Sequence, residues 1–366
     1  MNGRDRFLTA LANEKPDRLP CQVHNWMGYY LNRYLGGADV FTAYEMFDMD
    51  PVIYVGPIYH FDESDLANGR HEHQNLGQDA DGITHMVDTW TTPGGVLTQK
   101  SASNEFTAWV TKRIIETKQD FEIWSKYMPV PIGCDWSPVI EAKKRIGNRG
   151  IVRSVLYDFG QCSPWQSFCI LFETESAIMA AMDDPQWVHH VLSDLLDKKL
   201  RAIERMGKSE LDLVEVGGGA GSNTVISPKM FREFCLPYDQ KQIRATQEGG
   251  PKVVYHLCGG LMKMLDLVVE TGANGLETMT PPEMGGDCNL SEATKKVGDK
   301  LFFIGGFDQN RGFEKGTPET ARQLVRECHE ACPDGGYICS PSDHFFFGDP
   351  ENVRAFSEEA RGCEYS

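Results

Sequence analysis

Short apolar runs alternate with long segments of helical periodicity from about residue 150 onward. The runs have the length and the β-branched and aromatic content of buried strands, and they lie at 151–156, 211–216, 252–256, 275–279, 301–305 and 336–340. The segments between them carry apolar residues at helical spacing, at 183–206, 228–247, 260–271, 289–297 and 317–331. Such an alternation makes the strands parallel and the helices their crossovers. For a chain of 366 residues it predicts an α/β fold, a (β/α)8 TIM barrel.

The first part of the chain has a different pattern. Residues 1–75 are expected to be mainly helical, with one helix over 4–14 that ends before Pro16 and helical segments over 27–48 that are broken at Gly36-Gly37. Residues 83–116 alternate apolar and polar side chains around the turn Thr92-Pro93-Gly94-Gly95, which predicts a β-meander. The sequence therefore predicts one domain over 1–366, with a helical segment and a meander added to the barrel.

The charge and cysteine content exclude several classes of function. A formal net charge of −17 argues against nucleic acid or an anionic membrane as a partner, because both require basic patches. No apolar run approaches the ~18–20 residues that cross a bilayer. The eleven cysteines are scattered, without a CxxC pair or a secretory signal pattern, as in proteins of a reducing compartment. We expect a cytoplasmic enzyme.

The predicted strands end in polar side chains. In a (β/α)8 barrel the carboxyl ends of the strands form the mouth where active groups lie. The side chains concerned are Glu215, His256, Cys258, Glu277, Asp308, Cys339, Asp343 and His344. So many polar strand ends around one mouth predict a functional site there.

His256 and Cys258 stand two residues apart, so both side chains lie on one side of the chain if the strand continues. Imidazole nitrogen and thiolate sulfur are zinc ligands, with bonds of ~2.0–2.3 Å. A half-buried histidine beside a packed cysteine, without any metal, would produce the same sequence pattern. A third ligand from a neighbouring strand end would favour the metal, and the stretch 339–344 offers Cys339, Asp343 and His344.

Other motifs are weaker. Gly217–Gly221 lacks the spacing of a nucleotide-binding loop and is interpreted as a place where backbone approaches another group closely. His71-Glu72-His73 is interpreted as a solvated surface loop. Ser342-Asp343-His344 has the letters of a catalytic triad, but neighbouring residues on one loop cannot adopt that geometry.

Several stretches together resemble the uroporphyrinogen decarboxylase superfamily over nearly the whole chain. They are Arg6–Leu11, Pro16–Pro20, Tyr255–Gly259, Gly286–Leu290, Phe303–Asp308 and Gly316–Glu319. The resemblance implies a distorted TIM barrel, in agreement with the alternation of strands and helices.

Within the superfamily, the chain resembles the zinc methyltransferases that work with corrinoid proteins. The decarboxylases carry an arginine-rich Met-Arg-Gln-Ala-Gly-Arg segment, whereas residues 21–28 here contain no arginine. The methyltransferases are marked by His-x-Cys and a later ligand, and His256 and Cys258 match that mark. Where the enzymes that alkylate coenzyme M have Ala-Pro-Gly-Cys, this chain has Ser340-Pro-Ser-Asp343. The resemblance thus implies zinc bound by His256, Cys258 and Asp343, with Glu215 or water as fourth ligand.

The implied reaction moves a methyl group from an O-methyl donor, such as an aryl methyl ether, to the Co(I) of a corrinoid (cobalamin). The chain lacks the Asp-x-His-x-x-Gly corrinoid motif, so we expect the corrinoid on a separate partner protein. Glu215, Asp308 and His344 are the expected catalytic groups. The expected substrate contacts are His24, Trp26, Tyr157, Trp165 and Glu277. A homodimer is compatible with the sequence.

Three alternatives remain at this point. A methylcorrinoid:thiol methyltransferase would use zinc to activate a thiol, and a decarboxylase acting on another acid would need no metal. A binding or assembly subunit on a retained barrel would also bind no metal.

Overall fold

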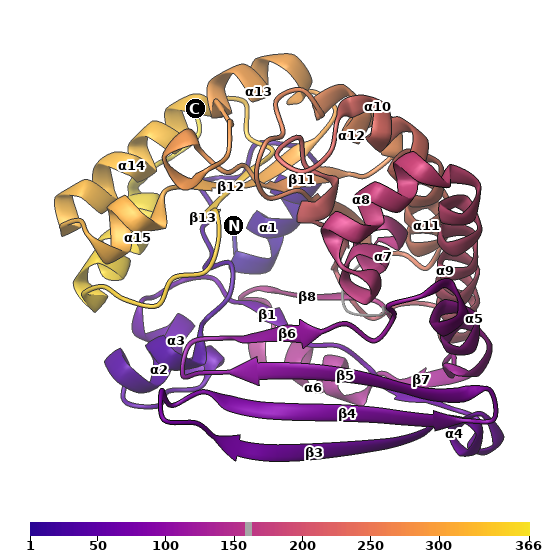
Figure 1. The fold of residues 1–366 in the computed structure, drawn as a ribbon. Helices are drawn as coiled ribbons and strands as arrows, with labels where there is room; N and C mark the ends of the chain where they lie inside the picture. The colour runs from indigo at the N-terminus through magenta and orange to yellow at the C-terminus, as the bar shows by residue number, and fades with distance from the viewer. Residues whose placement is uncertain (158–162) are drawn as a thin grey trace.

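A computed structural model describes residues 1–157 and 163–366 of the chain. Its centre is a curled parallel sheet with helices on the outside (Figure 1). The sheet has seven strands in the order β1 (Val52–Tyr54), β8 (Ile151–Val155), β9 (Leu213–Gly217), β10 (Lys252–His256), β11 (Gly275–Thr278), β12 (Phe302–Phe307) and β13 (Tyr337–Pro341). The predicted α/β class and the parallel sheet are confirmed. The eight-stranded closure is not, because the described residues form seven strands.

A short segment takes the eighth place beside β13. The amide of Cys339 donates to the Pro20 carbonyl and the amide of Gln22 donates to the Cys339 carbonyl, both at 2.9 Å. These bonds form one isolated parallel bridge, between Cys21 and Cys339, rather than a ladder. Pro20 has no N–H to donate, which shortens the pairing at that end. The segment therefore extends the β13 edge of the sheet by one bridge, where a full strand of a closed barrel was expected.

The helices cover the sheet because each has an apolar stripe. In the longest of them, buried Val188, Val191, Leu192 and Leu195 follow the i, i+3, i+4, i+7 spacing of one helix face. The helices that follow β8 are α7 (Pro164–Phe172), α8 (Thr174–Asp183), α9 (Pro185–Met206), α10 (Pro228–Met230), α11 (Leu236–Glu248), α12 (Leu265–Thr271), α13 (Leu290–Val297), α14 (Pro318–Ala331) and α15 (Pro350–Gly362). The helices before it are α1 (Gly3–Leu11), α2 (Gly28–Tyr34), α3 (Val40–Met46), α4 (Glu63–Asn68), α5 (Lys118–Tyr127) and α6 (Ser137–Ile146).

The predicted meander is a four-stranded antiparallel sheet that lies below the curled sheet in Figure 1. It consists of β3 (Arg70–Gln78), β4 (Thr84–Thr92), β5 (Gly95–Ser103) and β6 (Ala108–Lys112). It starts earlier than the expected 83–116, and His71-Glu72-His73, interpreted as a loop, lies in strand β3. Every residue of β3 is exposed, so this edge strand lacks the apolar alternation by which a strand is recognised. The segment 1–75 is thus only partly helical, since it also contains β1 and β2 (Ile58–His60), which pairs with β7 (Gly133–Asp135).

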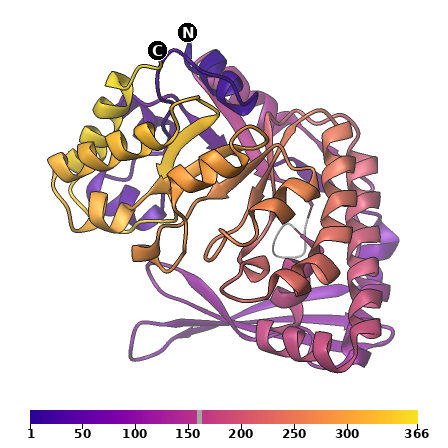
Figure 2. The same ribbon diagram turned by 90° about the horizontal axis from the view of Figure 1, so that it is seen from above.

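The two ends of the chain lie side by side (Figure 2). The amide of Leu19 donates to the Cys363 carbonyl at 2.8 Å, and Arg18 and Glu364 form an antiparallel bridge. One continuous hydrophobic core runs from Phe7 to Cys363. None of the described helices is both long enough and apolar enough to cross a membrane.

Candidate active site

Four charged side chains from adjacent strands meet inside the curled sheet: Arg153 of β8, Glu215 of β9, His256 of β10 and Glu277 of β11. The guanidinium of Arg153 donates to both oxygens of Glu277, from Nη1 to Oε2 and from Nη2 to Oε1, each at 2.8 Å. Nη2 also donates to Glu215 Oε2 at 3.0 Å. The side chains of Arg153 and Glu277 are fully buried. Their charges are therefore stabilised mainly by each other.

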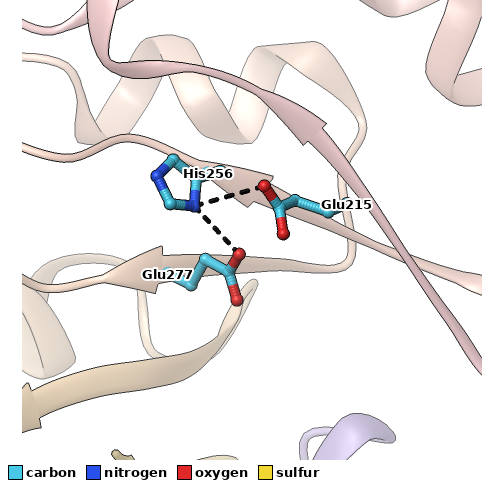
Figure 3. Close-up of side chains that lie close together, drawn as sticks. All are labelled: Glu215, His256 and Glu277. Carbon is cyan, nitrogen blue, oxygen red and sulfur yellow. Dashed lines mark hydrogen bonds and ion pairs between the residues drawn. The ribbon is translucent and has the colours of Figure 1, made fainter. Parts of the chain in front are cut away.

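The two carboxylates also hold His256 (Figure 3). Its Nδ1 lies 3.1 Å from Glu277 Oε1 and 3.5 Å from Glu215 Oε1. An ionised carboxylate only accepts hydrogen bonds, so Nδ1 carries the hydrogen. The other ring nitrogen, Nε2, points away from both carboxylates in Figure 3. In the neutral imidazole Nε2 then has the lone pair that a metal ion requires.

The ionisation of the two carboxylates differs. Burial raises the pKa of Glu277, but Arg153 and His256 outweigh it and hold the pKa well below its ordinary value. Burial and the neighbouring Glu277 raise the pKa of Glu215. For His256, burial lowers the pKa, but Glu215, Cys258 and Glu277 together bring it well above its ordinary value. Glu277 is thus the anion that pairs with Arg153, and Glu215 is the carboxyl that keeps a proton more readily.

Cys258 lies beside His256, since contact between the two side chains contributes to the raised pKa of the imidazole. The loop after β9 packs tightly against this strand end. A Cβ on Gly219 would lie 2.5 Å from the Cys258 sulfur, and a Cβ on Gly217 would lie 2.5 Å from the His256 carbonyl oxygen. The close backbone approach predicted for Gly217–Gly221 is confirmed, and its partner is the His-x-Cys segment.

The predicted third ligand lies elsewhere at the mouth. Among the described residues, the group of three potential ligand atoms that all lie within 4.8 Å of one another belongs to Glu215, His256 and Glu277, and it includes neither Cys258 nor Asp343. Asp343 is 54% exposed, and its Oδ1 accepts from the His344 amide at 2.7 Å. Cys339 is fully buried and contacts Cys328 of α14, on the helix side of the sheet. Glu277, which was expected to contact the substrate, thus lies beside Nδ1 of His256, where it orients the imidazole.

Three imidazoles line the mouth. The His24 ring centroid lies 5.7 Å from that of His256 and 5.4 Å from that of His344. Burial, together with the positive groups around His24, lowers its pKa to about 3 although Glu277 opposes this. His24 is therefore neutral at physiological pH and lies at the mouth, where the sequence analysis expects a substrate contact.

Other predicted residues lie in packed surroundings. Trp26 is 5% exposed and stacks on Phe47, and Trp165 is fully buried with its Nε1 donating to the Ala220 carbonyl at 3.0 Å. The Tyr157 hydroxyl donates to the Pro129 carbonyl at 2.8 Å. Asp308 is 3% exposed, and its Oδ1 accepts from the Arg311 amide at 3.0 Å. The two tryptophans therefore belong to the core, and Asp308 caps a turn beside the mouth.

Sequence reasoning missed Arg153 and Tyr54. Arg153 stands inside the apolar run Ile151-Val-Arg-Ser-Val155, and a single arginine in a buried strand was the available signal. Its guanidinium carbon lies 4.6 Å from the centroid of the Tyr54 ring, a cation–π contact. Tyr54 thus packs against the guanidinium of Arg153.

Residues 108–363 match the family described as uroporphyrinogen decarboxylase (URO-D), and the chain belongs to that family. The uroporphyrinogen decarboxylase of Xanthomonas campestris is 28% identical over 177 residues, which are 44% of this chain and 46% of that protein. A chloroplastic uroporphyrinogen decarboxylase of Oryza sativa is 23% identical over 190 residues, 50% of this chain and 45% of that protein. The chain thus spans about half the length of the curated relatives it matches.

A solved methyltransferase from Methanosarcina mazei shares the fold over the full length. It is 14% identical, the superposition covers 99% of each chain, and the TM-score is 0.66. The curled parallel sheet, its helical cover and the additions before it therefore form an established TIM-barrel-like architecture.

Proposed function

We propose that this protein is a zinc-dependent methyltransferase that moves a methyl group from an O-methyl donor to the Co(I) of a separate corrinoid protein. The observation that carries the proposal is the orientation of His256. Glu277 accepts from Nδ1 and Glu215 lies 3.5 Å from it, so Nε2 faces away from both carboxylates, and Cys258 contacts the same imidazole. A histidine oriented by a carboxylate through its second nitrogen is the usual arrangement of zinc-binding imidazoles.

The donor set fits zinc. His256 Nε2 and the Cys258 sulfur would supply a borderline and a soft ligand, and Asp343 would supply the oxygen ligand by turning toward them from the mouth. When bound, zinc acts as a Lewis acid on the ether oxygen of the donor, which makes that oxygen a better leaving group. The chain's own contribution is the Arg153–Glu277 pair, which fixes the imidazole in one tautomer and one orientation.

Glu215 is proposed as the general acid. The leaving oxygen departs with the electron pair of the broken C–O bond while the methyl group bonds to cobalt, so the oxygen requires one proton. Glu215 lies at the site, and its raised pKa favours the protonated form that can supply it. His24 and His344, which flank the mouth, are proposed to position the donor, an aryl methyl ether.

The site argues against porphyrinogen decarboxylation, although the curated relatives bear that name. A poly-acidic substrate requires unpaired cations. Arg153 is already paired with Glu277 and Glu215, and residues 21–28 contain no arginine. The methylcorrinoid:thiol reaction is disfavoured because Cys339, the nearest substitute for the missing thiolate, lies buried on the helix side. We place the protein in the cytoplasm, where its thiols stay reduced.

The test is methyl transfer with purified components. The protein is mixed with a reduced corrinoid protein and a methoxyphenol, and conversion of Co(I) to methyl-Co(III) is followed by visible spectroscopy. We expect turnover with the wild type and none with His256→Ala or Cys258→Ala. Methyl transfer from methylcorrinoid to a small thiol, or carbon dioxide release from a porphyrinogen, without reaction on any methyl ether would overturn the proposal.

A further inference from the structure

The loop that follows strand β13 carries Asp343 and His344, and the pairing of β13 with β12 ends just before it. The two strands lie side by side as far as Phe307 and Pro341 (Figure 1). The side chains of Asp343 and His344 are 54% and 39% exposed. Asp343 Oδ1 accepts from the His344 amide at 2.7 Å, which is a bond within the loop itself. The position of the loop over the mouth therefore depends on contacts beyond the strand pairing.

Gln309, two residues after the end of β12, supplies two of these contacts. It is 3% exposed. Its Oε1 accepts from the Ser342 amide at 3.1 Å, and its Nε2 donates to the His344 carbonyl at 3.3 Å. An amide oxygen only accepts and an amide nitrogen only donates, so a side chain turned the other way would set donor against donor and acceptor against acceptor. One buried side chain thus holds the loop on both sides of Asp343.

Gln309 is itself fixed by the turn that follows β12. Asp308 Oδ1 accepts from the Arg311 amide at 3.0 Å, and the Asp308 carbonyl accepts from the Gly312 amide at 2.8 Å. Both bonds close the backbone turn in which Gln309 stands. Asp308, which the sequence analysis expects to be catalytic, thus holds the backbone from which Gln309 reaches the loop.

Ser342 ties the beginning of the loop to the end of β12. It is fully buried. Its amide also donates to the Phe307 carbonyl at 3.0 Å, and its hydroxyl accepts from the Gly306 amide at 3.1 Å. The first residue of the loop therefore keeps two bonds to β12 when Gln309 is replaced.

The far end of the loop has an anchor of its own. Glu314 Oε1 accepts from the Phe346 amide at 2.9 Å. Between this anchor and Ser342, the bond from Gln309 to the His344 carbonyl holds the segment that carries both functional side chains. Replacement of Gln309 should therefore loosen this middle segment while both ends of the loop stay attached.

We propose that Gln309 is a positioning residue, which keeps Asp343 and His344 at the mouth through its two hydrogen bonds to the loop. This role rests on the proposed function, in which Asp343 supplies the oxygen ligand and His344 positions the donor. The loss of a partner that orients a metal ligand typically costs about 10–100-fold in metal affinity. The geometry of the site is thus set partly by β12, although Asp343 follows β13.

The first measurement is amide exchange followed by mass spectrometry, which depends neither on zinc nor on activity. Gln309→Met has nearly the same length but lacks both hydrogen-bonding groups. Its amides at 342–345 should exchange at least about threefold faster, because one net hydrogen bond changes a local equilibrium by about 2- to 10-fold. The matched control is Gln247→Met, since Gln247 Nε2 donates to the Gly272 carbonyl at 2.9 Å, before strand β11. In this control the 342–345 amides should exchange as in the wild type.

The second measurement is zinc affinity in a double-mutant cycle. Gln309→Met should weaken zinc binding about tenfold in the otherwise unchanged protein. In the Asp343→Ala background it should have no further effect, because Gln309 acts through Asp343, whereas the effects of independent sites add. Gln309→Asn keeps the amide but is one methylene too short to make both bonds. It serves as a milder second variant and should act in the same direction.

The two measurements separate the role of Gln309 from the proposed function. If the wild type binds no zinc at the mouth, the proposed function fails, and the exchange rates alone decide whether Gln309 holds the loop. The positioning role is overturned if the 342–345 amides of Gln309→Met and Gln309→Asn exchange as in the wild type. It is also overturned if Gln309→Met weakens zinc binding equally with and without Asp343.

Discussion

Arg153 and Glu277 form a fully buried, bidentate ion pair, with both nitrogen–oxygen distances at 2.8 Å and the two residues 124 positions apart in the chain. Removing one partner of such a pair leaves an uncompensated buried charge. Glu277 also lies 3.1 Å from Nδ1 of His256. The placement of this candidate zinc ligand therefore depends on a fully buried salt bridge.

Glu277→Gln should therefore damage both the fold and the metal site. We expect zinc affinity to fall about 10–100-fold, because the imidazole loses its anionic partner. The free energy of unfolding should fall by roughly 3–5 kcal/mol, because Arg153 is left with Glu215 alone. Zinc competition assays and denaturant titrations measure the two effects, with exposed Glu283→Gln as control. Unchanged zinc affinity in Glu277→Gln would contradict the orienting role.

Gly219→Ala should displace the Cys258 sulfur, since the added Cβ would lie 2.5 Å from it. The expected result is a loss of tightly held zinc and of methyl transfer with the fold retained, because the loop lies at the end of the sheet. Zinc content after dialysis checks this. Gly133→Ala, whose Cβ would meet nothing within 4 Å, is the matched control. Full zinc content in Gly219→Ala would show that the sulfur is not a ligand.

Asp343→Ala and Cys339→Ser distinguish the candidates for the third ligand. Asp343 is exposed at the mouth, whereas Cys339 is buried against Cys328. If Asp343 turns toward the metal, its loss should weaken zinc binding at least about tenfold. Cys339→Ser should leave zinc binding unchanged. Unchanged zinc affinity in Asp343→Ala would show that Asp343 is not a ligand.

The stability of the protein should fall as the pH rises from about 4 to about 7 in a way that depends on Asp239. This buried residue of α11 accepts from the Tyr255 hydroxyl at 2.6 Å. Burial raises its pKa from 3.8 to about 7, against the opposing effects of Tyr255 and Lys199. The folded state therefore binds the extra proton over this range, and folding stability decreases with rising pH, by roughly 4 kcal/mol over the whole range.

Asp239→Asn should remove this part of the pH dependence, because the amide does not titrate. Urea unfolding at pH 4.5 and pH 7.5 compares the two proteins, and the difference between them isolates the contribution of Asp239. Equal pH dependence in wild type and variant would show that Asp239 keeps an ordinary pKa.

The alternation of strands and helices could be predicted from the sequence, because each element is marked by the spacing of apolar residues within its own segment. Strand β10 begins and ends at the predicted residues, and its parallel neighbours follow from the helices between them. Strand β3 escaped prediction because an exposed edge strand has no buried face to impose a pattern. The ion pair between Arg153 and Glu277 was not predicted, because the two residues are far apart in the chain. A contact of this kind leaves no periodic pattern in the local sequence.

The tryptophans illustrate a different limit. Trp26 and Trp165 have the same large apolar rings whether they pack in the core or stack on a ligand, so residue type alone does not separate the two places.

The Pro20–Gln22 segment is attached to β13, at the end of the seven-stranded sheet, by a single bridge. Local opening of a folded protein costs the least free energy where backbone hydrogen bonds are few, as they are at this segment. His24 lies two residues after this segment, and its ring is near those of both His256 and His344. Slow amide exchange in the seven strands and fast exchange in the Pro20–Gln22 segment would show that local opening there can move His24 while the other side chains of the mouth stay in place.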